Sequence, residues 1–168
     1  SSVFKLNHTR NELAAGATGY HELLVAKPTV TEPTLLIDPD GNRVRLVPKG
    51  WQGVEQIGMV LKVSNLDAHR TFYRDILQIE ELSENQFKWG ATVFVLELAD
   101  SDIGGSQMGA AGGFQYLTVQ VWHVDQEHAD FVARGGAEAD PPRTLGSTAR
   151  ISFIQDPDGN WIEISQRA

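Results

Sequence analysis

The stretch Gln155–Ile164 reads QDPDGNWIEI, and the stretch Ile37–Leu46 reads IDPDGNRVRL. In both copies, aspartate stands first, proline second and glycine fourth in Asp-Pro-Asp-Gly, which is the composition of a type I turn. Apolar residues flank each turn, so each stretch predicts two strands joined by a hairpin. The copies differ three residues after the asparagine, where one has Glu163 and the other Arg45. A hairpin that recurs so far along the chain indicates a repeated structural module.

The residues between the two hairpins contain a further unit of strands around a helix. Gln56–Leu82 reads QIGMVLKVSNLDAHRTFYRDILQIEEL, and the alternating apolar residues of MVLKV predict a strand with one buried face. Ser64 or Asn65 can cap the helix that follows, whose apolar residues recur at helical spacing over about three turns. Two further strands, Glu81–Trp89 and Ala91–Leu98, meet at a glycine turn. The expected order is strand, helix, strand, strand and one more short strand.

The same order of elements returns after a glycine-rich break. Asp100–Gly113 reads DSDIGGSQMGAAGG, which is typical of a linker or a surface loop. A strand over Gln115–Trp122, a helix over about Asp125–Ala133 and a stop at Gly135–Gly136 follow. The hairpin QDPDGNWIEI then adds two strands.

Residues 1–50 look like the same unit without its beginning. TRNELAAGATG predicts a short helix ended by glycine, GYHELLVAKP predicts a strand, and TLLIDPDGNRVRLV contains the hairpin. Only SVFKL is left for the first strand, and it is too short. We therefore expect an α+β fold of three βαβββ modules, at 1–50 (incomplete), 55–100 and 113–168. The odd, incomplete count suggests a piece of a longer chain, or a module that another chain completes.

The composition restricts the partners of the chain. It has 168 residues, 41% of them hydrophobic and 21% charged, with a net charge of −8 and no cysteine. These values are ordinary for a globular domain and fit a reducing cytoplasm, and the lack of cysteine excludes thiolate metal sites and cysteine nucleophiles. The negative charge argues against nucleic acid as the main partner, and no apolar run is long enough to cross a membrane. A metal ion or a neutral or cationic small molecule suits this charge better.

The stretches VLKVSNLDAHRTFYRDIL and FIQDPDGNWIEI together resemble the vicinal oxygen chelate superfamily, the group of glyoxalase I, extradiol dioxygenases and bleomycin-resistance proteins. Both stretches lie in 55–168, so the resemblance implies one complete two-module domain there, and 1–50 resembles one module more weakly. In that family, paired modules form cupped mixed sheets around a divalent metal ion, with helices on the outer face. The incomplete module implies a homodimer, or association with a complementary module.

Strand alternation indicates which residues face the cup, and the resemblance indicates which of them would bind metal. Alternation turns Glu97 and Glu163 away from the helices and toward the cup. The resemblance implies carboxylate ligands at these cup-facing positions, and such a ligand can also act as the catalytic base. The family's histidine positions on the first strands hold Gly58 and Tyr116, which are poor ligands. A shift of two residues brings in Gln56, so the implied set for Fe, Mn, Zn or Ni is Glu97, Glu163 and Gln56. For either glutamate, a plain strand carboxylate is the alternative interpretation.

Other side chains face the cup by the same alternation. Trp122 and Trp161 are interpreted as an aromatic platform for a planar ligand, or as filling for a cup without metal. Lys62 could bind an anionic group or simply reach solvent. The candidate substrate-binding set is therefore Tyr116, Thr118, Gln120, Trp122, Trp161 and Lys62.

The histidines and Arg45 are expected to play minor roles. His69 and His128 lie on predicted helix surfaces and should face solvent, whereas His21 could line a second cavity. Arg45 cannot bind a metal ion, so it favours an anionic ligand or a structural salt bridge. The first module is therefore expected to be non-catalytic.

Two functions fit these features. The first is metal-dependent chemistry of lyase, isomerase or dioxygenase type on a small oxygenated molecule, with the metal stabilising an enolate or similar anion. The second is a metal-free protein of the bleomycin-resistance type that sequesters a planar or cationic compound. The two glutamates favour the first function, and the missing histidines favour the second. A plugged cup that serves only for assembly is a third possibility.

Overall fold

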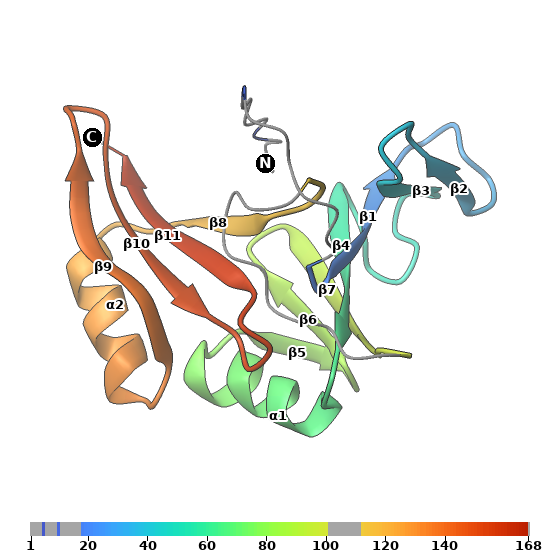
Figure 1. The fold of residues 1–168 in the computed structure, drawn as a ribbon. Coiled ribbons are helices and arrows are strands. Elements are labelled where there is room, and N and C mark those ends of the chain that lie inside the picture. The colour runs from blue at the N-terminus through green and yellow to red at the C-terminus, as the bar shows by residue number, and fades with distance from the viewer. Residues whose placement is uncertain (1–4, 6–9, 11–17, 101–111, 168) are drawn as a thin grey trace.

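The computed structural model describes Lys5, Arg10 and residues 18–100 and 112–167. They form two mixed sheets and two helical segments (Figure 1), which confirms the predicted α+β class. The helices are α1 (Leu66–Thr71), which continues as a π-helix over Phe72–Ile76, and α2 (Val124–Ala133). The strands are β1 (Tyr20–Ala26), β2 (Thr34–Ile37), β3 (Arg43–Val47), β4 (Ile57–Val63), β5 (Glu80–Ser83), β6 (Gln86–Trp89), β7 (Thr92–Leu98), β8 (Tyr116–Gln120), β9 (Ala137–Leu145), β10 (Ala149–Gln155) and β11 (Trp161–Arg167).

One strand order recurs in the two sheets. The seven-stranded sheet has the order β2-β3-β1-β4-β7-β6-β5, and the four-stranded sheet has the order β8-β11-β10-β9. In each, the strand before a helix (β4 or β8) pairs in parallel with the last strand of the same unit (β7 or β11). The next two strands continue antiparallel. The units over 55–100 and 113–168 therefore share one topology but lie in different sheets, and their grouping as one domain stays a prediction.

The strands before residue 50 repeat part of this topology. β1 pairs in parallel with β3, as β4 does with β7, and β2 and β3 form the first DPDGN hairpin. β1 also pairs antiparallel with β4, so the partial unit extends the sheet of the next one. Tyr20–Ala26 thus holds the first-strand position, which the sequence assigned to SVFKL. That stretch, apart from Lys5, lies outside the described residues, as does most of the predicted helix TRNELAAGATG.

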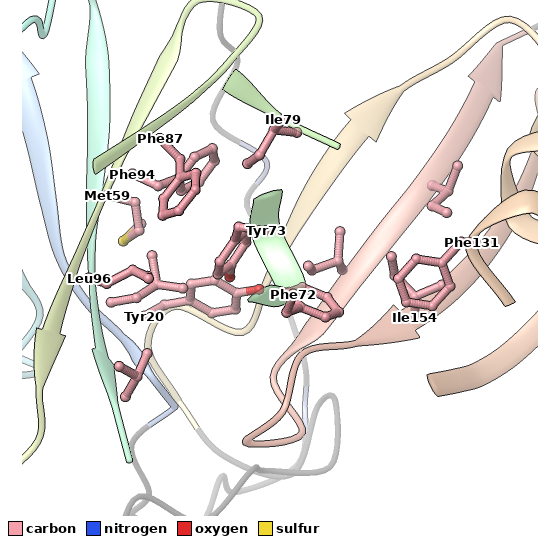
Figure 2. Close-up of a cluster of buried hydrophobic side chains, with 14 of the residues drawn as sticks. Tyr20, Met59, Phe72, Tyr73, Ile79, Phe87, Phe94, Leu96, Phe131 and Ile154 are labelled. Carbon is pink, nitrogen blue, oxygen red and sulfur yellow. The ribbon is translucent and has the colours of Figure 1, made fainter. Parts of the chain in front are cut away.

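A row of aromatic rings joins the two sheets. Tyr73 stacks on Phe94 of β7 with the ring centroids 6.4 Å apart, and it meets Phe72 edge-on at 5.1 Å. Phe72 in turn meets Phe131 of α2 at 5.9 Å. Figure 2 shows Tyr73 and Phe72 between the strands that carry Phe87 and Phe94 and the helix that carries Phe131. These rings are buried, so the predicted helix RTFYRDIL supplies one core to both sheets.

The two DPDGN turns have the same internal hydrogen bonds. The carbonyls of Asp38 and Asp156 accept the N–H of the glycine three residues later, at 3.0 and 2.9 Å, as the predicted turns require. Each carboxylate also accepts bonds from the backbone and side chain of the asparagine that ends the motif. The glycines adopt positive φ angles, 87° at Gly41 and 78° at Gly159, which a residue with a side chain rarely adopts.

The second turn is docked into the molecule. The carboxylate of Asp158 accepts the backbone N–H of Ser64 at 2.7 Å and also the Ser64 hydroxyl. The side-chain oxygen of Asn160 accepts the backbone N–H of Gly19, also at 2.7 Å. This turn of the four-stranded sheet therefore fixes the junction between β4 and α1. Asp38 and its turn, in contrast, are exposed.

His69 is part of this docking, so its predicted exposure to solvent was wrong. The side chain is fully buried, and its Nε2 lies 3.5 Å from Asp156 and 3.6 Å from Asp158. Its Nδ1 donates a hydrogen bond to the carbonyl of Asn65 at 2.9 Å. Burial lowers the pKa of His69, but the hydrogen bond and charge of Asp156 outweigh burial, and the pKa is raised. The turn from another unit covers this face of α1, which helical periodicity cannot reveal.

The structure differs from the predicted elements in three further places. The predicted strand Glu81–Trp89 is a hairpin of β5 and β6, with a turn in which Asn85 has a φ of 61°. The strand β9 was missed because its sequence, AEADPPRTL, contains two prolines. These prolines fall at a register shift opposite β10, on an edge strand, where proline is tolerated. Strand alternation would place Leu98 in the core with Phe94 and Leu96, but Leu98 is exposed at the end of β7.

None of the described helices combines the length and the apolar character that crossing a membrane requires.

Candidate functional site

The face of the four-stranded sheet opposite α2 carries an aromatic cluster. Phe153 of β10 meets Tyr116 and Trp161 edge-on, with ring centroids 5.7 and 5.4 Å away. Strand alternation correctly turned Tyr116 and Trp161 away from the helix, because Ile162 and Ile164 lie in the core under α2. Phe153 was missed by the sequence reasoning, although alternation along ARISFIQ also turns it to this face.

Glu163 lies buried beside these rings. It stands directly opposite Phe153 on one side and Thr118 on the other, and it is only 3% exposed. Its Oε2 accepts hydrogen bonds from the Thr118 hydroxyl at 2.9 Å and from the Lys5 ammonium at 3.2 Å. A buried carboxylate needs such donors, because desolvation of the charge is otherwise costly. Glu163 and Thr118, both singled out in the sequence, therefore belong to one site.

Lys5 places a cation between this carboxylate and an aromatic ring. Its Nζ lies 3.2 Å from Glu163 Oε2 and 5.1 Å from the centroid of the Tyr116 ring. Partial burial lowers the pKa of Lys5, but the side chains of Tyr116 and Glu163 outweigh this effect, and the pKa is raised. No pattern in the sequence pointed to Lys5, because it precedes β8 and β11 by more than a hundred residues. We call Tyr116, Thr118, Phe153, Trp161 and Glu163 the Glu163 platform.

The second predicted carboxylate lies in the other sheet. Glu97 lies near the end of β7, and its Oε2 pairs with the Lys62 ammonium of β4 at 3.0 Å. Alternation placed these two residues correctly on one face, opposite to the face that α1 covers. The Glu97 side chain is 49% exposed, whereas Glu163 is buried. The structure therefore gives each glutamate its own cation and does not bring the two together.

The remaining positions considered for metal binding do not complete a metal site. Gln56 precedes β4, where its carbonyl accepts the N–H of Ala26 at 2.8 Å. At Gly58, an added Cβ would lie 3.0 Å from the carbonyl oxygen of Val93 and 3.2 Å from Leu24 Cδ1. Little room is therefore left for a side chain at Gly58. Within 18–100 and 112–167, no three His, Asp or Glu side chains are grouped so that they could hold a metal ion. The residues present therefore do not fit a shared ion.

Two other candidates, Gln120 and Trp122, are exposed, and a second histidine is buried. Gln120 is exposed at the end of β8, and Trp122 lies beyond β8 and is 88% exposed, so it does not join Trp161 in a platform. His128 was predicted to face solvent, and this was wrong. It is buried between α2 and β9, where its Nε2 lies 2.6 Å from the Glu138 carboxylate.

The seven-stranded sheet contains an ion cluster that the sequence reasoning found only in part. Glu22 of β1 is 3% exposed and pairs with both Arg43 and Arg45 of β3. For Arg45, the sequence left a structural salt bridge as one of two alternatives, and this bridge is present. Glu22 was missed, although alternation along YHELLVA turns it to the same face as Leu24. His21, beside it, is half-buried.

Comparisons with known proteins agree with this fold. The glyoxalase family protein from Enterococcus faecalis is 25% identical, with a TM-score of 0.56, over 63% of this chain and 92% of that chain. A glyoxalase-related enzyme from Fulvimarina pelagi is 20% identical, with a TM-score of 0.53, over 66% of this chain and 86% of that chain. TnmS3, an antibiotic binding protein from Streptomyces sp. CB03234, is 24% identical, with a TM-score of 0.51, over 66% of this chain and 93% of that chain.

No curated protein matches the chain. The model of the Glyoxalase/Bleomycin resistance protein/Dioxygenase superfamily matches residues 56–164, which is more than half of the sequence. These residues contain the helix and the hairpin on which the resemblance rested, together with Glu97 and all five residues of the Glu163 platform. The chain therefore belongs to the glyoxalase/bleomycin resistance/dioxygenase superfamily.

Proposed function

We propose that this protein binds a planar, cationic small molecule on the Glu163 platform, without a metal ion. The observation that carries the proposal is the position of the Lys5 ammonium, which lies 3.2 Å from Glu163 and 5.1 Å from the Tyr116 ring centroid. The platform thus already holds a cation, which the chain itself supplies. A ligand with a positive charge would take the place of Lys5.

The chemistry of the platform suits such a ligand. Aromatic faces attract cations through their quadrupole, and this attraction grows when water is excluded. A buried carboxylate adds a charge-assisted hydrogen bond. Phe153 and Trp161 supply apolar area for stacking against a flat ring system. A neutral ligand of the same shape would gain the stacking but leave Glu163 without a cation.

The comparisons support this choice in a limited way. The family includes bleomycin resistance proteins, and TnmS3 is named as an antibiotic binding protein. Metal-dependent lyase, isomerase or dioxygenase chemistry on an oxygenated molecule stays a prediction from the resemblance, with Glu97, Glu163 and Gln56 as its residues. The separate ion pairs of the two glutamates favour the binding protein over that reaction.

The proposal is tested with N-methylacridinium and with uncharged acridine at mildly alkaline pH, followed by quenching of tryptophan fluorescence. Glu163→Gln should weaken N-methylacridinium binding by about tenfold or more, because the buried charge partner is lost. Lys5→Gln should tighten binding, because the competing internal cation is removed. Glu81→Gln is the matched control: Glu81 is also ion-paired, to Arg70 at 2.8 Å, but lies on β5.

Three results would contradict this function. One is equal affinity for N-methylacridinium and acridine, and another is unchanged binding in both Glu163→Gln and Lys5→Gln. The third concerns metal content after soaking with manganese, iron, zinc and nickel. A stoichiometric divalent ion that is lost in Glu163→Gln would replace the binding protein by the metal-dependent enzyme.

A further inference from the structure

We propose that a second site, on the Arg43–Arg45 face of the seven-stranded sheet, binds a small organic carboxylate. We define this face by Glu22, Arg43, Arg45, Lys62 and Glu97. It lies on a different sheet from the Glu163 platform and carries the opposite excess charge. Its existence does not depend on the function proposed for that platform.

The charges on this face do not balance. Arg45 alone satisfies Glu22 in a forked geometry, with Nε 2.5 Å from Oε1 and Nη2 3.1 Å from Oε2. Arg43 reaches only Oε2, from which its Nε and Nη2 each lie at the longer distance of 3.2 Å. Lys62 and Glu97 neutralise each other at 3.0 Å. One guanidinium is therefore in excess, in a chain whose net charge is −8.

The excess charge is open to a ligand. The side chains of Arg43 and Arg45 are 31% and 29% exposed, whereas the Glu22 side chain beneath them is only 4% exposed. A half-buried guanidinium is poorly hydrated and binds carboxylates through two parallel N–H groups. The pKa of His21 is lowered chiefly by burial; Arg43 and Lys62 lower it further, and Glu22 and Glu97 act in the opposite direction.

Apolar neighbours indicate an organic ligand rather than a simple inorganic anion. Val60 stands opposite Glu22 in the β1–β4 pairing, and Leu24 stands opposite Arg45 in the β1–β3 pairing. Both belong to the apolar cluster on this face, against which the partly buried Val95 also packs. Leu24 and Val60 are themselves buried, so a carboxylate with a small apolar body would place its charge on Arg43 and its body against the partly buried Val95. Benzoate has this shape, and benzamide is its uncharged equivalent.

The test measures benzoate and benzamide binding by amide chemical shifts in NMR titrations at constant ionic strength. Benzoate should shift the amides of β1 and β3, and benzamide should not. Arg43→Gln should weaken benzoate binding by about tenfold, because a charge-assisted pair is lost. Arg150→Gln is the matched control, since Arg150 of β10, on the other sheet, pairs with Asp125 of α2 without excess charge. Its affinity for benzoate should equal that of the original protein.

Arg43→Gln leaves Glu22 paired with Arg45, so the fold should persist; thermal melting checks this. If it does not fold, Arg43→Lys keeps the charge without the fork and should bind benzoate with intermediate affinity. Equal binding of benzoate and benzamide would overturn the proposal, and so would unchanged affinity in both Arg43 variants. Equal displacement of benzoate by chloride and by phosphate at low concentration would indicate an adventitious ion only, and would also overturn it. N-methylacridinium binding should be the same in Arg43→Gln, so failure here leaves the Glu163 platform unaffected.

Discussion

At the scale of the residue, one position of the repeated hairpin carries opposite charges in the two sheets. Glu163 and Arg45 stand three residues after the asparagine of the same turn, on strands that are last in their units. Each residue forms an ion pair with a residue of opposite charge: Glu163 pairs with Lys5, and Arg45 pairs with Glu22. Ligands of opposite charge are therefore expected on the two sheets. The difference between Glu163 and Arg45 can be seen in the sequence, whereas the role of Lys5 cannot, because no periodicity connects Lys5 to β11.

His69 should make stability depend on pH. Its Nδ1 already donates to Asn65, so an uncharged ring would face Asp156 and Asp158 with a lone pair, and protonation replaces this repulsion by an ion pair. Because its folded-state pKa is raised above the ordinary value of 6.5, this stabilisation is complete below that value. It is lost as the pH rises through the raised pKa.

Urea unfolding from about pH 6 to about pH 9 measures this effect as a decline in the free energy of unfolding. In His69→Gln the decline attributable to this ring should vanish. His123, exposed at the start of α2, provides the control His123→Gln, which should keep the decline. A decline of the same size in His69→Gln would show that other groups cause it.

At the scale of the element, identical turns have different energetic roles. The hairpin, its turn type and its glycine were predictable, because Asp-Pro-Asp-Gly determines local backbone geometry. The docking of the second turn was not, since it depends on Ser64 and His69 from another unit. The same cause explains why the buried histidine was misjudged. β9 was missed for a related reason: its two prolines are tolerated only because the register shifts opposite β10.

Asp158→Ala and Asp40→Ala test this difference at equivalent positions of the two turns. Asp158→Ala leaves the Ser64 backbone N–H and hydroxyl without their acceptor, and should lower the free energy of unfolding by about 1–3 kcal/mol. Asp40→Ala, in the exposed turn, should leave stability unchanged. Urea denaturation of the two variants beside the original protein makes the comparison. Equal losses would mean that the turn itself, rather than its docking, requires the second aspartate.

At the scale of the whole molecule, the sequence predicts the topology within each unit better than the strand pairing between units. The repeat predicted the units over 55–100 and 113–168, and alternation correctly oriented Tyr116, Trp161 and Lys62. Neither pattern could show that β4 pairs with β1 while β8 lies in a separate sheet, because pairing between units depends on nonlocal contacts. The pairing between units determines which cup-facing residues lie close together. The separation of Glu97 from Glu163 therefore could not be predicted from the sequence either.

The shared core predicts that the two sheets unfold together. The rings of Phe94, Tyr73, Phe72 and Phe131 form one continuous row from β7 to α2. Loss of either sheet would expose part of this row to water, at a cost of about 1.5–3 kcal/mol for each ring. We therefore expect coincident urea transitions by far-UV circular dichroism and tryptophan fluorescence. Two separated transitions would show that the sheets are independent.

The exposed first turn also offers a practical advantage. Asp38 is held by bonds within its own hairpin, and its turn lies at the surface between β2 and β3. A short epitope, a fluorophore attachment point or a cysteine for immobilisation could be inserted next to Pro39, far in sequence from the Glu163 platform. The same graft next to Pro157 would break the contacts to α1. A labelled protein for ligand screening should therefore carry its tag in the first copy of the motif.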